Sequence, residues 1–129
     1  MAGDVIFGAI LAGGEGRRIG GRKALVEIAG APLIARVAAP LRASVSRLAV
    51  IGDVEAAAAL GAELVGDAPG LPRGALSGIA SGLDWAARGG ADWLVVAPCD
   101  TPFLPAGFVA RLHAAAVSAD APSACARTE

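Results

Sequence analysis

Two segments of the chain bring together residue types that could bind phosphate and metal. The first, residues 11–23, reads LAGGEGRRIGGRK and holds five glycines, three arginines and the only lysine of the chain, Lys23. Glycines let a backbone approach an anion closely and turn its N–H groups toward it, while arginine and lysine side chains neutralise phosphate charge. We therefore predict a phosphate-binding loop here. The alternative is a solvated turn that happens to carry basic residues.

Two familiar phosphate-binding motifs do not fit this first segment. A P-loop needs the pattern GxxxxGK[ST]; Gly16 and Gly21 have its spacing, but Arg22 follows Gly21 and Ala24 replaces the metal-binding hydroxyl. The dinucleotide-binding pattern GxGxxG is also absent, because Gly20 comes one position too late. The sequence therefore gives little support to a P-loop enzyme or to an oxidoreductase.

The second segment, residues 98–105, reads PCDTPFLP and follows an apolar run. Its aspartate, Asp100, suits Mg²⁺, which prefers hard oxygen ligands and often combines one or two carboxylates with substrate phosphates and water. The alternative is that Asp100 is a turn residue or caps the helix that begins near Pro105. Cys99 has no general base near it in sequence, so we expect a small buried residue. His113 is expected on a helix, at the surface or half-buried.

Apolar runs alternate with helical patterns along the chain. Strands are predicted at residues 5–11, 47–51, 63–65 and 92–97, and helices at 31–43, 54–60, 76–88 and from Pro105 onward. This alternation predicts an α/β fold of three layers, with a mainly parallel sheet and helices on both of its faces. Such sheets bind ligands beyond the carboxyl ends of their strands, which is where both segments lie.

Two later stretches carry more specific expectations. The helix at residues 76–88 has an apolar stripe along one face and is ended by Gly89-Gly90. The residues of this stripe are Leu76, Ile79, Leu83 and Ala86 or Ala87. Near the end of the chain, APSACAR at residues 121–127 could begin a further strand. We therefore expect a chain that is truncated at its C-terminus.

Composition and charge narrow the class of protein. Hydrophobic residues make up 55% of the 129 residues, against a usual ~45–50%, so a single folded domain over residues 1–129 is expected rather than disorder. The net charge of −1 gives no support for binding to nucleic acid or to a membrane. The two cysteines are too few for a disulfide framework, and no apolar run reaches roughly 18 residues. We expect a soluble cytoplasmic protein that is a monomer or a weak oligomer.

Both segments resemble motifs of known enzymes. The pattern LAGG-x-G-x-R-x-GG-x-KAL, present from Leu11 to Leu25, resembles the signature loop of nucleotidyltransferases that release pyrophosphate. The string PCDTPFLP is similar to the hallmark of the molybdenum cofactor guanylyltransferases, a family of the nucleotidyltransferase superfamily with a Rossmann-like fold. Between them, Asp67 and the stretch GALSGIASGL at residues 74–83 are similar to that family's D…GPLAGIxxGL segment. The resemblance covers residues 5–113.

The resemblance implies a role for the first segment and for the residues between the two. The residues that would line the nucleotide there are Leu11, Ala12, Gly13, Gly14 and Asp67. Small residues after position 74 would let a helix N-terminus approach the nucleotide, where free N–H groups suit anions. A turn aspartate before Pro69-Gly70 is the alternative for Asp67.

The resemblance also implies the residues that take part in the reaction. Lys23 and Arg18 would contact the phosphates, and Asp100 would hold Mg²⁺ and contact the nucleotide. Three positions depart from the family pattern. Ile19 stands where methionine is usual, Arg22 stands where an acidic residue is common, and the stretch 51–53 stands where an asparagine usually meets the nucleotide.

The implied reaction is the transfer of GMP from GTP to molybdopterin or the molybdenum cofactor, with Mg²⁺ as cofactor and pyrophosphate as leaving group. Molybdoenzyme maturation proteins are the expected protein partners. Two alternatives stay open. One is a cytidylyltransferase or another nucleotidyltransferase on the same scaffold. The other is a guanine-nucleotide-binding module without catalytic activity.

Overall fold

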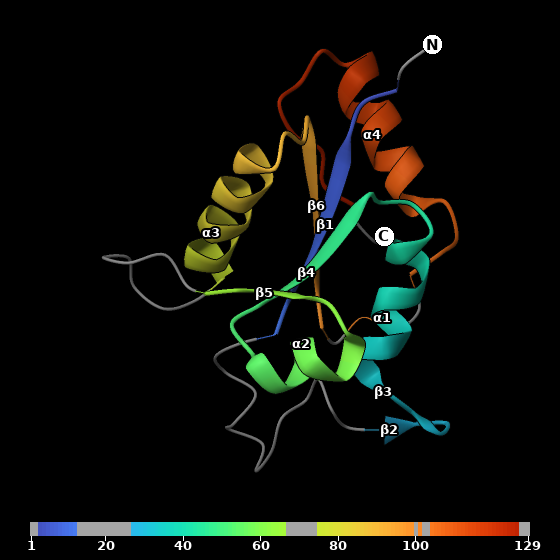
Figure 1. The fold of residues 1–129 in the computed structure, drawn as a ribbon. Helices are drawn as coiled ribbons and strands as arrows, with labels where there is room; N and C mark the ends of the chain where they lie inside the picture. The colour runs from blue at the N-terminus through green and yellow to red at the C-terminus, as the bar shows by residue number, and fades with distance from the viewer. Residues whose placement is uncertain (1–2, 13–26, 67–74, 100, 102–103, 127–129) are drawn as a thin grey trace.

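The computed structural model of the protein describes residues 3–12, 27–66, 75–99, 101 and 104–126 (Figure 1). Four strands form its main sheet: β1 (Ile6–Leu11), β4 (Arg47–Ile51), β5 (Glu63–Val65) and β6 (Trp93–Pro98). They are all parallel and lie in the order β5-β4-β1-β6. The predicted parallel sheet is confirmed. Its central strand, β1, is buried between two neighbours because it is a continuous apolar run.

Helices cover both faces of this sheet, as the sequence predicted. They are α1 (Leu33–Arg42), α2 (Val54–Leu60), α3 (Ala75–Arg88) and α4 (Phe108–Ser118). Figure 1 shows α3 on one face, with α1 and α4 on the other. The chain passes from β1 through β4 to β5 in one direction and then crosses back through α3, which places β6 on the opposite side of β1.

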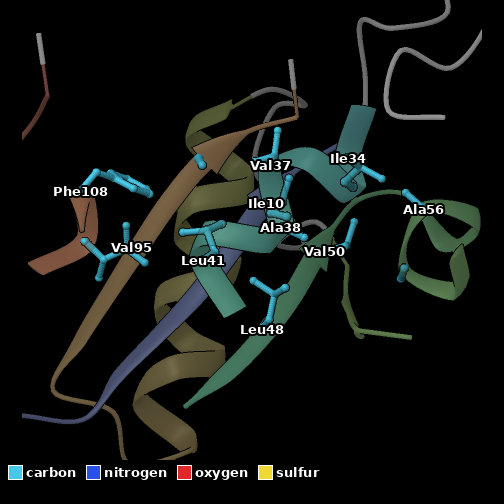
Figure 2. Close-up of a cluster of buried hydrophobic side chains, with 13 residues drawn as sticks. Ile10, Ile34, Val37, Ala38, Leu41, Leu48, Val50, Ala56, Val95 and Phe108 are labelled. Carbon is cyan, nitrogen blue, oxygen red and sulfur yellow. The ribbon is translucent and has the colours of Figure 1, made fainter. Parts of the chain in front are cut away.

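The main core lies between the sheet and the helices α1 and α4. Figure 2 shows its buried side chains, which come from β1, β4, β6 and the helices. Among them are Ile10, Ile34, Val37, Leu41, Val50, Val95 and Phe108. Because successive side chains of a strand point to opposite faces, Phe7, Ala9 and Ile51 lie on the face that α3 covers.

A short hairpin precedes α1 and was not expected from the sequence. Strands β2 (Glu27–Ile28) and β3 (Ala31–Pro32) pair in antiparallel fashion around Ala29 and Gly30. Both turn residues have positive φ angles, +54° and +85°, as in the two-residue turns that suit the twist of a hairpin. The helix predicted from Ala31 therefore begins only at Leu33, because the two residues before it belong to the hairpin.

Two other expectations about elements need correction. The helix expected from Pro105 begins at Phe108, because residues 106 and 107 form a turn and Gly107 has a φ of +81°. Residues 121–126, the described part of the stretch expected to begin a further strand, form no strand. Among the described residues, no helix is long and apolar enough to cross a membrane.

Only part of the predicted stripe on α3 is buried. Ala86 is buried and Ile79 half-buried, but Leu76 and Leu83 are 82% and 54% exposed. Gly78 and Gly82 face the sheet instead, and a Cβ atom at Gly82 would lie 3.1 Å from the side chains of both Ile51 and Leu94. The helix can approach the strands closely because these positions carry no side chain.

Candidate nucleotide-binding site

The carboxyl ends of β1 and β6, from which the two segments of chemical interest continue, lie side by side. Leu11 lies opposite Pro98 in the parallel ladder, and the N–H of Cys99 donates to the carbonyl of Leu11 at 3.1 Å. On the other side of β1, the N–H of Ala12 donates to the carbonyl of Ile51 at 3.0 Å. The point where the first segment leaves the sheet is thus held by backbone bonds to both neighbouring strands.

The structure places only part of the predicted site. Leu11 and Ala12 are described and are both half-buried at this edge of the sheet. The other predicted residues lie outside the described residues: Gly13, Gly14, Arg18, Lys23, Asp67 and Asp100. The described neighbours of Gly13, Asp67 and Asp100 are at the same edge, since β1, β5 and β6 all end there. The roles predicted for these six residues stay predictions.

The segment around position 100 is tied to the end of β6. The hydroxyl of Thr101 donates to the carbonyl of Pro98 at 3.2 Å, three residues back. Cys99 is half-buried and packs against the main core, in agreement with the packing role expected for it. Its thiol is a soft ligand, whereas Mg²⁺ prefers oxygen, so Cys99 does not compete for the metal role predicted for Asp100.

The first turn of α3 reaches the same edge of the sheet. A Cβ atom at Gly78 would lie 2.7 Å from Cδ2 of Leu11 and 3.3 Å from Cγ2 of Ile51. Glycine at this position therefore lets the N-terminal part of the helix approach the ends of β1 and β4. One residue earlier, Ser77 is 1% exposed and its hydroxyl has no hydrogen-bond partner among the described residues.

The stretch that departs from the family pattern has a structural use in this chain. Asp53 is 7% exposed, and its Oδ1 accepts hydrogen bonds from the N–H groups of Glu55 at 3.0 Å and Ala56 at 3.1 Å. It therefore caps the N-terminus of α2. Ile51 is buried against α3. The capping role was missed, although an aspartate directly before an Ala-rich helical run is a signal for it.

The possible metal ligands of this site are the side chains with oxygen, nitrogen or sulfur donors near the ends of the strands. The described residues hold no group of three His, Cys, Asp or Glu side chains that could bind a metal ion. A single aspartate after β6 fits a magnesium ion that takes its other ligands from substrate phosphates and water. His113 is not part of such a site, because it lies on α4 with its Nε2 at 2.7 Å from Oδ2 of Asp4.

Comparisons with known proteins place this geometry in context. A family model described as the MobA-like NTP transferase domain matches residues 8–129. The molybdenum cofactor guanylyltransferase of Rhodobacter capsulatus is 50% identical over 113 residues, which are 86% of this chain and 59% of that protein. The enzyme of the same name from Cereibacter sphaeroides is 49% identical over 110 residues, 83% of this chain and 56% of its own length. The chain thus spans a little over half the length of these relatives.

A solved structure shares the fold. A nucleotidyl transferase from Methanothermobacter superposes with a TM-score of 0.62 at 24% identity, over 85% of this chain and 57% of that one. At that identity the likeness concerns the fold alone. It agrees with the parallel sheet and the two helical layers described above.

Proposed function

Since this chain belongs to the family of MobA-like NTP transferase domains, we propose that it binds GTP and serves in the transfer of GMP to molybdopterin, with release of pyrophosphate. One observation carries the proposal. The ends of β1 and β6 lie side by side, with the N–H of Cys99 on the carbonyl of Leu11 at 3.1 Å. This pairing supports the proposal because the basic glycine-rich segment and the segment that holds Asp100 continue from these two neighbouring strand ends.

The proposed roles follow from the chemistry of each group. Backbone N–H groups of the segment after Ala12 bind the phosphates, and Lys23 and Arg18 neutralise the charge that grows on the leaving pyrophosphate. Asp100 holds Mg²⁺, which when bound supplies positive charge to the phosphate oxygens. A terminal phosphate of molybdopterin attacks the α-phosphorus of GTP, and the bond from that phosphorus to the bridging oxygen breaks. The attacking phosphate is already ionised at neutral pH, so no general base is required.

A second candidate function is a guanine-nucleotide-binding module that does not catalyse transfer. Binding of GTP without release of pyrophosphate in the presence of molybdopterin would select the module. Stronger binding of CTP than of GTP would select a cytidylyltransferase on the same scaffold.

The substitution Asp100→Asn tests the proposed site. An amide binds Mg²⁺ far more weakly than a carboxylate, so we expect loss of Mg²⁺-dependent GTP binding and pyrophosphate release with unchanged circular dichroism. The matched control is Asp84→Asn on the surface of α3, where the exposed aspartate pairs with Arg88. Normal metal-dependent binding by a folded Asp100→Asn chain would refute the metal role.

Base specificity is a separate expectation. The unmodified chain should bind GTP about tenfold more tightly than CTP or ATP, which corresponds to about 1.4 kcal/mol of binding free energy.

A further inference from the structure

Helix α3 carries two buried serines whose hydroxyls have no hydrogen-bond partner among the described residues. Ser77 is 1% exposed and Ser81 is 8% exposed. A serine inside a helix commonly donates to the carbonyl four residues back. For Ser81 that carbonyl belongs to Ser77, and this bond is not formed. A buried hydroxyl without a partner destabilises a folded protein, so each of these two groups needs a physical explanation.

The two serines lie on one side of α3. Residues four apart are neighbours on the surface of a helix, so Ser77, Ser81 and Trp85 form one row. The direction of this row follows from the contacts of Trp85. Its ring packs against Phe7 of β1, and its indole N–H donates to Glu63 of β5 at 3.2 Å. The row therefore faces the side of the sheet that ends with β5.

Glycines next to the serines fix the position of this part of the helix. Each serine directly precedes a glycine in the sequence. A Cβ atom at Gly78 would lie 3.3 Å from Cγ2 of Ile51, and one at Gly82 would lie 3.1 Å from the side chains of Ile51 and Leu94. A rotation of α3 that carried its serines toward a strand would separate the glycines from these side chains. The serines therefore cannot gain a partner on the sheet without loss of this packing.

The side chains between α3 and β5 are shorter beside the serines than beside Trp85. The helix runs antiparallel to the strands, because its first turn meets the end of β1 and its last turn meets the start. Two residues along a strand span about 6.6 Å and four along a helix span about 6 Å. Since Glu63 is level with Trp85, Val65 is level with Ser81. An indole ring bridges the helix and the strand at one level, and a valine and a hydroxymethyl group face each other at the next.

We propose that Ser77 and Ser81 form a hydration site, in which one ordered water molecule bridges the two hydroxyls on the side of α3 that faces β5. Side chains four apart on a helix have Cβ atoms about 5–6 Å apart, and an O–H···O bond is about 2.8 Å long. One water molecule therefore reaches both oxygens. Buried water typically satisfies polar groups that have no other partner. The bound water gives each hydroxyl a partner while α3 keeps its packing on the sheet.

A double-mutant cycle followed by thermal unfolding tests the proposal. Ser77→Ala and Ser81→Ala should each lower the Tm by about 2–5 °C, because each deprives the water of one partner and leaves the other hydroxyl poorly satisfied. The double variant should have a higher Tm than either single variant, because no hydroxyl remains to be satisfied. The greater helix preference of alanine is the same in single and double variants, so it cancels when the double is compared with the sum of the singles.

Two other results would overturn the proposal. Hydroxyls that are buried without any partner predict that each single substitution raises the Tm and that the two effects add. Hydroxyls that bond to two separate protein groups predict that each substitution lowers the Tm and that the double variant loses the sum. The control is Ser118→Ala at the exposed end of α4, which should leave the Tm unchanged.

A crystal structure of the unmodified chain at high resolution gives a direct test. The proposal requires electron density for one water molecule within about 2.6–3.2 Å of both Oγ atoms. Density for a protein group at that place, or no density there in a well-ordered α3, would refute the hydration site.

Discussion

The guanidinium of Arg47 joins three strands and a helix at the amino-terminal edge of the sheet. It lies over the rings of Phe7 and Trp85, at 5.0 and 5.4 Å from their centroids, and donates through Nε to Glu63 at 2.8 Å. The indole N–H of Trp85 donates to the same carboxylate at 3.2 Å. The hydrogen bond from Arg47 holds the pKa of the Glu63 carboxyl below its usual value. The short edge strand β5 is attached to the body of the protein by this group.

Gly89 packs tightly against Phe7 and Arg47, with no room for a side chain. A Cβ atom at that position would lie 2.4 Å from Cε2 of Phe7 and 2.9 Å from Nη1 of Arg47. Because the Phe7 ring is buried, it has little room to move. We therefore predict that Gly89→Ala lowers the free energy of unfolding in urea by about 1–3 kcal/mol. Gly66→Ala is the control, since nothing lies within 4 Å of a Cβ there. Equal values for the two variants would contradict this packing.

The residues of the candidate site differ in the signals that they give in the sequence. The glycines, the basic residues and Asp100 stand out because they gather in two segments that follow apolar runs, and their roles stay predictions. The hydrogen bond from Arg36 to the carbonyl of Ala29 could not be predicted, because an arginine on an amphipathic helix is ordinary and its partner is a backbone group. Asp4 and His113 could not be paired from the sequence, because they are 109 residues apart.

Among the elements, the strands were predicted best. The predicted strand at residues 47–51 agrees with β4, and those at 5–11 and 92–97 differ from β1 and β6 by a single residue at their ends. These strands are apolar runs bounded by turn residues, so burial and local pattern agree. The hairpin β2–β3 was missed, because strands of two residues have no periodicity and its turn uses Ala29, which is not a common turn residue.

Helix α3 shows why an apolar stripe does not by itself identify the buried face. Its bounds were predicted to within one residue, but two leucines of its predicted stripe, Leu76 and Leu83, are largely exposed. Small residues, including Gly78, Ser81 and Gly82, lie on the face toward the sheet, and Trp85 packs against Phe7 of β1. Hydrophobicity alone would bury the leucines, whereas close packing of the helix on β1 and β4 requires residues with small side chains on the buried face. In α3 the requirement for close packing determines which face is buried.

The same substitution on two helices tests this orientation. We predict that Leu83→Ala on α3 lowers the free energy of unfolding by less than about 1 kcal/mol, because over half of the side chain is already exposed. Leu41→Ala on α1 should cost about 2–5 kcal/mol, because Leu41 is fully buried in the main core. Urea unfolding followed by circular dichroism measures both. A large loss for Leu83→Ala would mean that this face of α3 is covered.

For the molecule as a whole, Asp4 connects parts of the chain that are distant in sequence. Its Oδ2 accepts a hydrogen bond from the indole N–H of Trp93 at 2.9 Å and lies 2.7 Å from Nε2 of His113. The segment before β1 is thereby attached to β6 and to α4. The hydrogen bond with His113, and after it the bond from Trp93, lowers the pKa of the Asp4 carboxyl.

Acid should release this connection in a way that can be followed. The pKa of Asp4 is lower in the folded chain than in the unfolded one, so its contribution to stability is present above the unfolded value, 3.8, and is lost as the pH falls through the folded value. We predict that Asp4→Asn lowers the Tm at pH 7 and that the difference from the unmodified chain shrinks toward pH 3. The fluorescence of Trp93, measured in a Trp85→Phe background, should change over the same range. A Tm difference that is independent of pH would exclude this role for the carboxylate.

The position of β1 between β4 and β6 also determines the order in which the strands of the sheet can pair during synthesis. Its first neighbour, β4, begins at Arg47, but its second neighbour begins only at Trp93. During synthesis on the ribosome, one edge of this apolar strand therefore stays open until the strand that begins at Trp93 has emerged. Non-local pairing of this kind slows folding, and open strand edges favour aggregation while it lasts. β1 is an inner strand of the sheet, yet it gains its second neighbour, β6, late in synthesis. Conditions that slow translation between β4 and β6 would prolong the exposure of the open edge of β1.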